Sequence, residues 1–305
     1  MRRAEKRNET TVVEFIILGF HSIPEGQFIL FVMFLVTYIT TVLGSLLIMV
    51  LAVTDHHLHN PMFFFLGNLS FLETCNTSTI LLGLLASFLT NKYAISPDGC
   101  FLQYFFFTGF AGAERCLLAA MSYDRYTAIC KPLHYTTVRN GRCCLQLAGG
   151  SWVSGLLASA RVTSLLPPLT FCGPNEIEHF FCDFTPVVKL SCSDTHWIEL
   201  AKFVLVFLLT LPPFLLTLIS YVYVSHTVLR IPSSTGRQKA FSTCSSHLTV
   251  VTLFYGTLIA PYLVPKTNTL GDLHKVFSVC YTVLTPLVNP LIYSLRNNNI
   301  KKALR

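Results

Sequence analysis

The feature that most limits what this chain can fold into is a series of long stretches without charged residues. A helix needs about 20 mainly apolar residues to cross the hydrocarbon core of a bilayer. Four stretches without Asp, Glu, Lys or Arg are long enough, and these are residues 28–54, 203–229, 240–265 and 276–295. A fifth uncharged stretch, residues 143–160, is shorter, and we expect its helix to continue to about residue 166.

Two further apolar stretches contain charged residues. Glu73 interrupts residues 62–90, and Glu114 and Arg115 interrupt residues 101–123. A charge at mid-membrane costs about 2.5–3.5 kcal/mol on insertion scales, and the neighbouring Leu and Phe residues can offset that cost. These two stretches bring the number of predicted spans to seven.

The predicted fold is therefore an all-α membrane protein, a single seven-transmembrane helix bundle that takes in residues 1–305. The expected spans are about 27–53, 62–88, 100–130, 143–166, 199–226, 238–262 and 274–296. Residues 1–26 would form an extracellular tail. Residues 297–305 would form a cytoplasmic tail with a short eighth helix.

Composition excludes other classes of protein. The chain is 52% hydrophobic and only 12% charged, whereas soluble domains carry about 25% charged residues. The net charge of +7 does not indicate nucleic-acid binding, because the basic residues lie in short loops and form no basic face. The first seven residues lack an apolar core, so we expect no removable signal peptide, and the first span would act as a signal anchor.

The loop charges predict that the N-terminus lies outside and the C-terminus inside. In that orientation basic residues dominate the inner segments, whereas acidic residues slightly outnumber basic ones in the outer loops, as the positive-inside rule requires. The basic N-terminal tail conflicts mildly with this orientation, although glutamates balance its charge. Asn8 begins an Asn-Glu-Thr glycosylation sequon that would face outward. We expect a multi-pass protein of the plasma membrane.

Four of the eleven cysteines lie in the predicted outer segments, where disulfides can form. They are Cys100, Cys172, Cys182 and Cys192. Four cysteines permit three pairings, and their spacing does not choose among them. The other seven read as apolar filler or free thiols, and palmitoylation of Cys143 or Cys144 is an open alternative.

Asp124 and Arg125 form an adjacent charge pair at the inner end of the third span. Such a pair can break and re-form when helices move, but it can equally anchor a helix at the membrane surface. The pair alone does not decide between these two interpretations.

Longer motifs in the sequence favour the first interpretation, a charge pair that breaks and re-forms when helices move. They are MSYDRYTAICKPLHY at 121–135, LHNPMFFFL at 58–66, KAFSTCSSHL at 239–248, PLVNPLIYSLRN at 286–297, TVVEFIILGF at 11–20 and Ser220-Tyr221. Together they resemble the signature of odorant receptors within the rhodopsin-like, G-protein-coupled receptor family, almost from end to end and in the family's order. Three positions depart from the pattern: Ser45 replaces the usual Asn, Phe63 a usual Tyr, and Ser122 a usual Ala. The Ser45 hydroxyl would replace the missing amide less completely.

The resemblance implies a mechanism. An odorant would shift the population towards a conformation in which the sixth span moves outward and Arg125 leaves Asp124. The partners would be a small-molecule odorant and a heterotrimeric G protein of the stimulatory or olfactory type, which raises cyclic AMP. The switch and coupling residues would be Asp124, Arg125, Tyr126, Tyr221, His247, Asn289, Pro290 and Tyr293. The family also implies disulfides Cys100–Cys182 and Cys172–Cys192.

The resemblance places a ligand pocket among the outer halves of the third, fifth, sixth and seventh spans. The expected lining residues are Phe107, Thr108, Ala111, Gly112, Leu205, Val206, Leu209, Tyr255, Leu258, Ile259, Tyr262, Val279, Thr282 and Val283. Mostly apolar side chains with a few hydroxyls suit small hydrophobic volatiles, although plain helix packing explains any one of these positions as well. Lys202 and Lys266 could attract a carboxylate, but lysines in loops are usually only solvated.

Glu73 and Glu114 would both lie deep in the membrane. Two close carboxylates there cannot both stay ionised without a partner. They could share a proton or a bound Na⁺. Alternatively, each could be hydrogen-bonded by hydroxyls such as that of Thr77 or be paired with Arg115. No other cofactor and no metal site are expected.

Three rival functions remain. A receptor for a non-odorant ligand would share the fold. A transporter would show repeated halves and paired broken helices, which the sequence lacks. An intramembrane enzyme would need a catalytic set such as His-Glu-x-x-His or Gly-x-Ser-x-Gly, and neither motif occurs.

Overall fold

A computed structural model of the chain describes residues 13–20, 26–54, 60–90, 92–133, 135, 141–172, 175–263 and 271–296. Within these ranges, the side chains of residues 239, 242–243, 260–263, 271–274 and 294–296 are not described. The predicted eighth helix and the Asn8 sequon lie outside the described residues.

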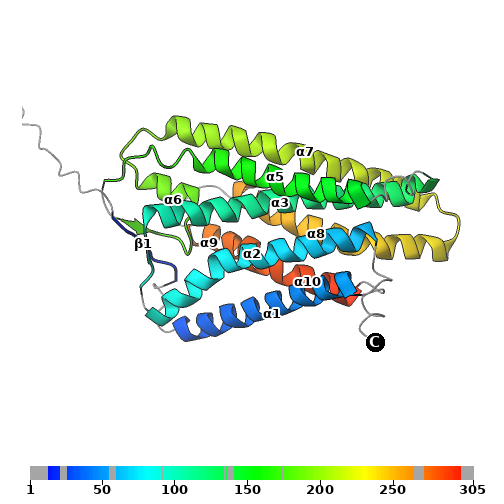
Figure 1. Cartoon of the computed structure of the whole chain (residues 1–305), viewed down its shortest axis with the longest axis horizontal. Helices are drawn as coiled ribbons and strands as arrows, with labels where there is room; N and C mark the ends of the chain where they lie inside the picture. Colours follow the sequence, from blue (N-terminus) through cyan, green and yellow to red (C-terminus); the bar gives the residue numbers. More distant parts are fainter. Residues whose placement is uncertain are drawn as a thin grey trace, which may run out of the picture.

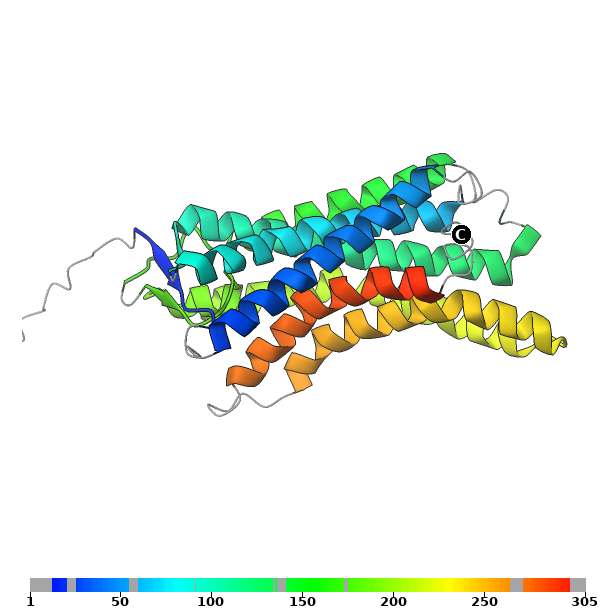
Figure 2. The ribbon, with the colours of Figure 1, turned by 90° about the horizontal axis from the view of Figure 1, so that it is seen from below.

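Long helices run side by side in a bundle, which confirms the predicted fold (Figures 1 and 2). Six of the spans are single helices: α1 (Gln27–Thr54), α2 (Pro61–Thr90), α3 (Pro97–Cys130), α5 (Gly141–Thr163), α7 (His196–Leu229) and α8 (Ser234–Leu263). The seventh is divided into α9 (Gly271–Val279), the π-helical turn η4 (Cys280–Leu284) and α10 (Thr285–Arg296). Most helices extend a few residues beyond the predicted spans, whereas α5 ends at Thr163 rather than near residue 166.

Among the described residues, five helices are long and apolar enough to cross a membrane, judged by length and composition: α1, α2, α5, α7 and the segment Lys275–Tyr293 of the seventh. The apolar part of α8 is the shorter Cys244–Ile259. The helices α1 and α7 turn large apolar side chains such as Val36 and Phe207 outward. The buried positions of the bundle also include polar residues such as Ser45, Glu73 and Asn289, and polar groups of helices surrounded by lipid are expected to face the interior in this way.

The centre of the bundle is α3, which packs against α5, α7 and α2. Glycines let α3 and α5 approach closely: a Cβ on Gly112 would lie 2.9 Å from the Cα of Gly155. Side chains of α2, α3, α8 and α10, among them Leu117, Phe254 and Tyr293, form the main core.

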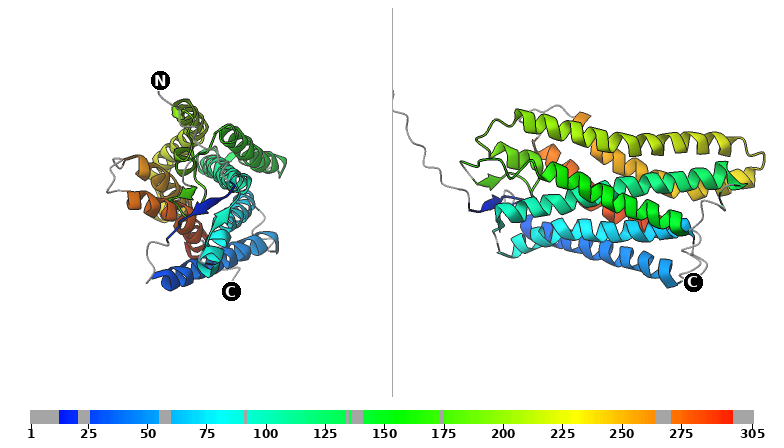
Figure 3. Two further views of the ribbon diagram at one scale, coloured as in Figure 1. Left: turned by 90° about the vertical axis from the view of Figure 1, so that its left-hand side faces the viewer. Right: turned by 45° about the horizontal axis from the view of Figure 1, so that its top comes forward.

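A small sheet at one end of the bundle was not predicted. The strand β1 (Phe15–Ile17) pairs antiparallel with β2 (Ala94–Ile95) and parallel with β3 (Glu176–Ile177). We call this the sheet end, and the opposite end, where Asp124 and Arg125 lie, the arginine end. Figure 3 shows the bundle viewed from the sheet end, with β1 crossing the ends of the helices.

Candidate functional site

The arginine end contains a buried ion pair. The Nη2 of Arg125 donates to Oδ2 of Asp124 over 2.8 Å, and the two side chains are 10% and 6% exposed. The hydroxyl of Tyr135 lies 3.4 Å from the other Asp124 oxygen, Oδ1. Since both charges are shielded from water and matched to each other, separating them requires a new partner for each.

The neighbours of Arg125 supply such partners. Tyr221 on α7 is hydrogen-bonded to Nδ1 of His247 on α8, and their rings are stacked. Arg125 acts electrostatically on Tyr221, on His247 and on Tyr293 of α10. The Tyr293 hydroxyl is buried without a hydrogen-bond partner among the described residues. The structure therefore gathers most of the predicted switch residues around Arg125.

The helices α3, α7 and α8 are closed against one another here. Tyr221, Val224, Val228 and Cys244 form an apolar cluster with residues of α3, and Tyr126 packs on its edge. We call this cluster the apolar seam between α3, α7 and α8.

Glu73 and Asn289 meet in the middle of the bundle. The Nδ2 of Asn289 donates to Oε1 of Glu73, and both residues are almost fully buried. Pro290 packs beside Gly44 of α1. A Cβ added to Gly44 would lie 3.0 Å from the Cβ of Pro290. Several buried oxygens have no hydrogen-bond partner within the part of the chain that the structure describes, and they are Thr41 Oγ1, Ser45 Oγ, Asn76 Oδ1, Thr77 Oγ1 and Asn289 Oδ1.

Glu114 and Arg115 act electrostatically on each other but differ in their other contacts. Glu114 is buried and acts electrostatically on Glu73 and on Tyr281 of η4. Arg115 instead donates from Nη1 to the Thr210 hydroxyl of α7 over 2.6 Å. In the described residues no carboxylate lies within ion-pair distance of Arg115, and the hydrogen bond expected from Thr77 to a carboxylate is not formed.

Both disulfides that the resemblance implied are formed at the sheet end. The Cα atoms of Cys100 and Cys182 are 5.4 Å apart, and those of Cys172 and Cys192 are 5.9 Å apart. Gln103 of α3 reinforces the first bridge, because its Oε1 accepts from the Cys182 amide. The loop that contains β3 is therefore held over the ends of the helices.

Part of the predicted pocket comes together beneath this loop. The Phe107 ring lies 5.0 Å from that of Phe181 in the loop and 5.9 Å from that of Tyr281. Val279 and Val283 pack in the same cluster. Deeper in the bundle, Tyr255 contacts Phe214 of α7. Leu258 packs against the same core.

Other predicted pocket residues face elsewhere. Thr108 is hydrogen-bonded to the Ser159 hydroxyl of α5, and Gly112 faces Gly155 of the same helix. Leu209 and Ile259 are 38% and 44% exposed. Of the remaining predicted residues, Ala111 is buried and Val206 is half-buried. Leu205 packs against an apolar cluster at the sheet end that includes Phe15 and Cys100, and the Thr282 hydroxyl donates to the Ser278 carbonyl. The Tyr262 side chain and Lys266 lie outside the described part of the chain.

His179 and Tyr281 were not identified from the sequence. His179 lies in the loop with its Nε2 3.3 Å from the Ser278 hydroxyl of α9, and its ring contacts Phe180 and Phe181. Burial lowers the pKa of His179 and nearby Lys275 adds to this, while Asp183 opposes it. The sequence feature that could have drawn attention to His179 is the string His-Phe-Phe-Cys, which ends at the disulfide cysteine Cys182. Tyr281 gave none, because nothing in the sequence marks a π-helical turn.

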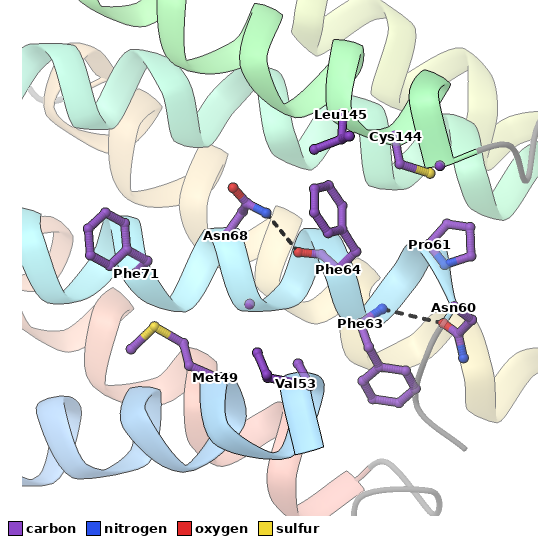
Figure 4. Close-up of a pocket in the computed structure, with 13 residues that line it drawn as sticks. Met49, Val53, Asn60, Pro61, Phe63, Phe64, Asn68, Phe71, Cys144 and Leu145 are labelled. Atoms are coloured by element: carbon purple, nitrogen blue, oxygen red, sulfur yellow. Dashed lines mark hydrogen bonds between the residues drawn. The ribbon is translucent and has the colours of Figure 1, made fainter. Parts of the chain in front are cut away.

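A separate groove of about 640 Å³ lies near the arginine end between α1, α2 and α5 (Figure 4). Its labelled walls include Val53 of α1, Phe64 and Phe71 of α2, and Leu145 of α5. None of the residues predicted to bind ligand lines this groove.

Comparison with known proteins gives concordant results. A family profile described as "Olfactory receptor" matches residues 34–305. Olfactory receptor 10A7 of Homo sapiens is 48% identical over 98% of this chain and 94% of its own length. Olfactory receptor 1f45 of Rattus norvegicus is 47% identical over 98% and 95%. The crystal structure of squid rhodopsin superposes with a TM-score of 0.67 at 15% identity, covering 88% of this chain and 81% of that one.

Proposed function

The chain belongs to the olfactory receptor family, and on that premise we propose that it binds a small hydrophobic odorant between α3, α7, α8 and the seventh helix. Members of this family are multi-pass receptors that bind an odorant and act on a G protein, and they are not enzymes. We further propose a G protein of the stimulatory or olfactory type and a rise in cyclic AMP.

The observation that carries the pocket is the aromatic cluster beneath the disulfide-bonded loop. Phe107, Phe181 and Tyr281 come from α3, the loop and η4, so a ligand among them would contact three elements at once. Each buried CH₂ of such a ligand contributes about 0.8 kcal/mol, which makes micromolar affinity attainable for a medium-sized volatile.

The proposed orientation places the sheet end outside the cell and the arginine end in the cytoplasm of a plasma-membrane receptor. Both disulfides support this orientation, because disulfides persist in oxidising compartments. The exposed apolar side chains of α1 and α7, and the groove beside α5, would then contact membrane lipid.

The proposed mechanism is a shift between two populations. In the closed state, Arg125 is held by Asp124 and the seam between α3, α7 and α8 is packed. An odorant that binds better to an open state would move the inner part of α8 outward, and Arg125 would then contact Tyr221 and the G protein. The Tyr293 hydroxyl, which is buried without a partner among the described residues, is available for the new contacts.

We also propose that Glu73 and Glu114 hold Na⁺ or share a proton. Oxygens of Thr41, Ser45 and Asn289 have no hydrogen-bond partner within the described residues, and they are buried on helices that pack against α2, the helix of Glu73. Oxygen donors of this kind suit hard cations. A bound cation would supply positive charge that neutralises the carboxylates. The Glu114→Gln variant should lose any sodium dependence of the agonist response, and an unchanged dependence would reject the site.

The function is tested by screening volatiles on cells that carry a cyclic AMP reporter. We expect at least one volatile to raise cyclic AMP, and we expect Arg125→Ala to abolish the response at unchanged surface expression. The exposed Arg161 at the sheet end of α5 provides the matched control, Arg161→Ala, which should respond as the unaltered receptor does. A normal response from Arg125→Ala would contradict the mechanism.

A further inference from the structure

The N-terminal part of the chain forms the central strand of the sheet. The strand order is β2-β1-β3, so β1 lies between β2, which precedes α3, and β3 of the disulfide-bonded loop. Figure 3 shows β1 lying across the ends of the helices. We call residues 13–20 the strap. Within the sheet, the two outer strands are joined through the strap, because they are not neighbours of each other.

Backbone hydrogen bonds tie the strap to the chain on both sides. On one side, the Ile17 amide donates to the Tyr93 carbonyl over 2.8 Å. On the other side, the Gly19 amide donates to the His179 carbonyl over 3.0 Å. Gly19 has a φ of 55°, a left-handed conformation that glycine adopts without strain. The strap therefore follows the loop from β3 as far as His179.

The strap is also docked by its side chains. Phe15 and Ile17 are 0% and 1% exposed, and both pack in the apolar cluster that contains the Cys100–Cys182 disulfide. The Phe15 ring meets that of Phe171 edge-on, with the ring centroids 5.2 Å apart. Because burial of large apolar side chains is favourable, the strap is part of the folded receptor.

The end of the strap reaches the proposed odorant site. The Phe20 ring is stacked on that of Phe180 in the loop, and it lies at the same centroid distance, 5.6 Å, from Phe34 of α1. The next loop residue, Phe181, contacts Phe107. All five rings pack in one apolar cluster. The strap thus supports, from the sheet end, the pair of rings that an odorant would contact.

The strap is the part of this cover that can separate. The Cys100–Cys182 bridge fixes the loop covalently, directly after Phe181. In contrast, β3 lies at the edge of the sheet, and among the described strands it pairs with β1 alone. These strands have three and two residues, and pairings this short open locally at low cost.

We propose that the strap is the gate of the odorant site, so that an odorant enters and leaves while the strap is separated from β2 and β3. This inference rests on the proposed function, because it assigns a route of entry to the same site. While the strap is paired, Phe20 packs on Phe180 and keeps Phe181 against Phe107. When the strap separates, β3 loses its neighbour in the sheet, and the loop can move as far as the disulfide permits.

The test uses two changes that should act in opposite directions. Ile16 and Ala94 are directly opposite each other in the antiparallel pair of β1 and β2, a spacing that suits a disulfide. The double variant Ile16→Cys with Ala94→Cys should therefore lock the strap, and Ile16→Cys alone is its control. Phe20→Ala should loosen the strap. Its matched control is Phe28→Ala, because Phe28 is 76% exposed at the start of α1.

The first measurement needs no odorant. Amide hydrogen exchange of the purified full-length receptor reports how often the strap opens. We expect residues 15–19 and 176–179 to exchange faster together in Phe20→Ala, and more slowly in the cross-linked receptor. Phe28→Ala should exchange as the unaltered receptor does. Unchanged exchange of the loop residues in Phe20→Ala would show that the strap does not hold β3, and would overturn the inference.

The second measurement follows binding of the strongest agonist from the screen of volatiles, in tritiated form. The cross-link should slow both association and dissociation at nearly unchanged affinity, because it fixes the closed state that the odorant occupies. Phe20→Ala should release the tritiated agonist about two- to tenfold faster, as expected from the loss of an aromatic contact. Phe28→Ala and Ile16→Cys alone should keep the ordinary rates.

Three outcomes would overturn the inference. They are rates that the cross-link leaves unchanged, equal dissociation from Phe20→Ala and Phe28→Ala, and failure of the cross-link to form. If Phe20→Ala is poorly expressed, the cross-linked receptor decides, because it retains the buried side chains of the strap. Rates independent of the strap would overturn this inference alone, whereas a receptor that binds no volatile would overturn the proposed function as well.

Discussion

Asn289 donates a hydrogen bond to Glu73 and thereby joins the seventh helix to α2 across 216 residues of sequence. Both side chains are buried, with Asn289 fully inaccessible and Glu73 1% exposed. A buried polar group that loses its partner keeps its desolvation cost, so the two residues should depend on each other energetically.

A double-mutant cycle on Glu73→Leu and Asn289→Leu should reveal this dependence. Each single variant leaves one polar group unpaired and should cost about 1–3 kcal/mol, whereas the double variant removes both groups and should cost less than the sum. Unfolding of the purified receptors measures the coupling. Pairing Glu73→Leu with Asn68→Leu is the control, because Asn68 bonds to Trp152 instead. Strictly additive costs for Glu73 and Asn289 would contradict the prediction.

The close approach of α3 and α5 predicts a size limit at Gly155. A Cβ there would clash with the backbone of Ala113, so Gly155→Val should destabilise the bundle by about 1–3 kcal/mol through overpacking. Gly150 on the same helix has open space around its would-be Cβ. Gly150→Val therefore controls for the change of residue type. Equal melting temperatures for the two variants would show that the helices are not packed in this way.

The two disulfides should differ in the stability they contribute. Cys100–Cys182 closes 82 residues and Cys172–Cys192 closes 20, and the entropy of the unfolded chain falls more when a longer loop is closed. Replacing Cys100 and Cys182 with Ser should cost about 4–5 kcal/mol, against about 3 for the shorter bridge. Melting temperatures of the two double variants test this. A larger loss from the shorter bridge would disagree with loop entropy as the main cause.

The helices could be predicted from the sequence because bilayer thickness fixes how long an apolar stretch must be. The contacts that side chains make between helices could not be predicted. Arg115 and Thr210 are 95 residues apart, and no local pattern indicates that α3 turns this arginine towards α7. Thr108 illustrates the same limit: its place on α3 suggested the cavity, but helix rotation directs it to Ser159 of α5.

The sheet end was the least predictable part. Its strands have two or three residues each, too few to show an alternating pattern, and they are held together by disulfides and loop contacts from distant parts of the chain. The π-helical turn at Cys280–Leu284 also escaped prediction. Its signature is the Thr285 backbone N–H donating to the Cys280 carbonyl, five residues back, which is a property of the folded backbone.

His179 predicts a loss of stability in acid. Its ordinary pKa is 6.5, and burial lowers the pKa in the folded protein. As the pH falls below about 6.5, the unfolded chain therefore takes up the proton first and is favoured. The melting temperature should drop from pH 7 to pH 5, and His179→Gln should lose that part of the drop. The two charges that face the ring, Asp183 and Lys275, remain in the variant. Parallel curves for the two proteins would exclude His179 as the cause.

The hydrogen bond between Tyr221 and His247 links α7 to α8 in the closed state, so breaking it should raise basal signalling. His247→Phe keeps an aromatic ring for stacking on Tyr221 but removes the ring nitrogen that takes part in the hydrogen bond. A neutral hydrogen bond contributes about 0.5–1.5 kcal/mol, which corresponds to a shift of about two- to tenfold towards the open state. Basal cyclic AMP, normalised to surface expression, should rise accordingly in the variant.

His226, exposed near the same end of α7, gives the control variant His226→Phe, which should keep ordinary basal activity. Because the open state is also the one that binds odorant better, the half-maximal odorant concentration should fall in His247→Phe as its basal signal rises. Basal activity that stays unchanged or decreases would show that this bond does not hold the receptor closed.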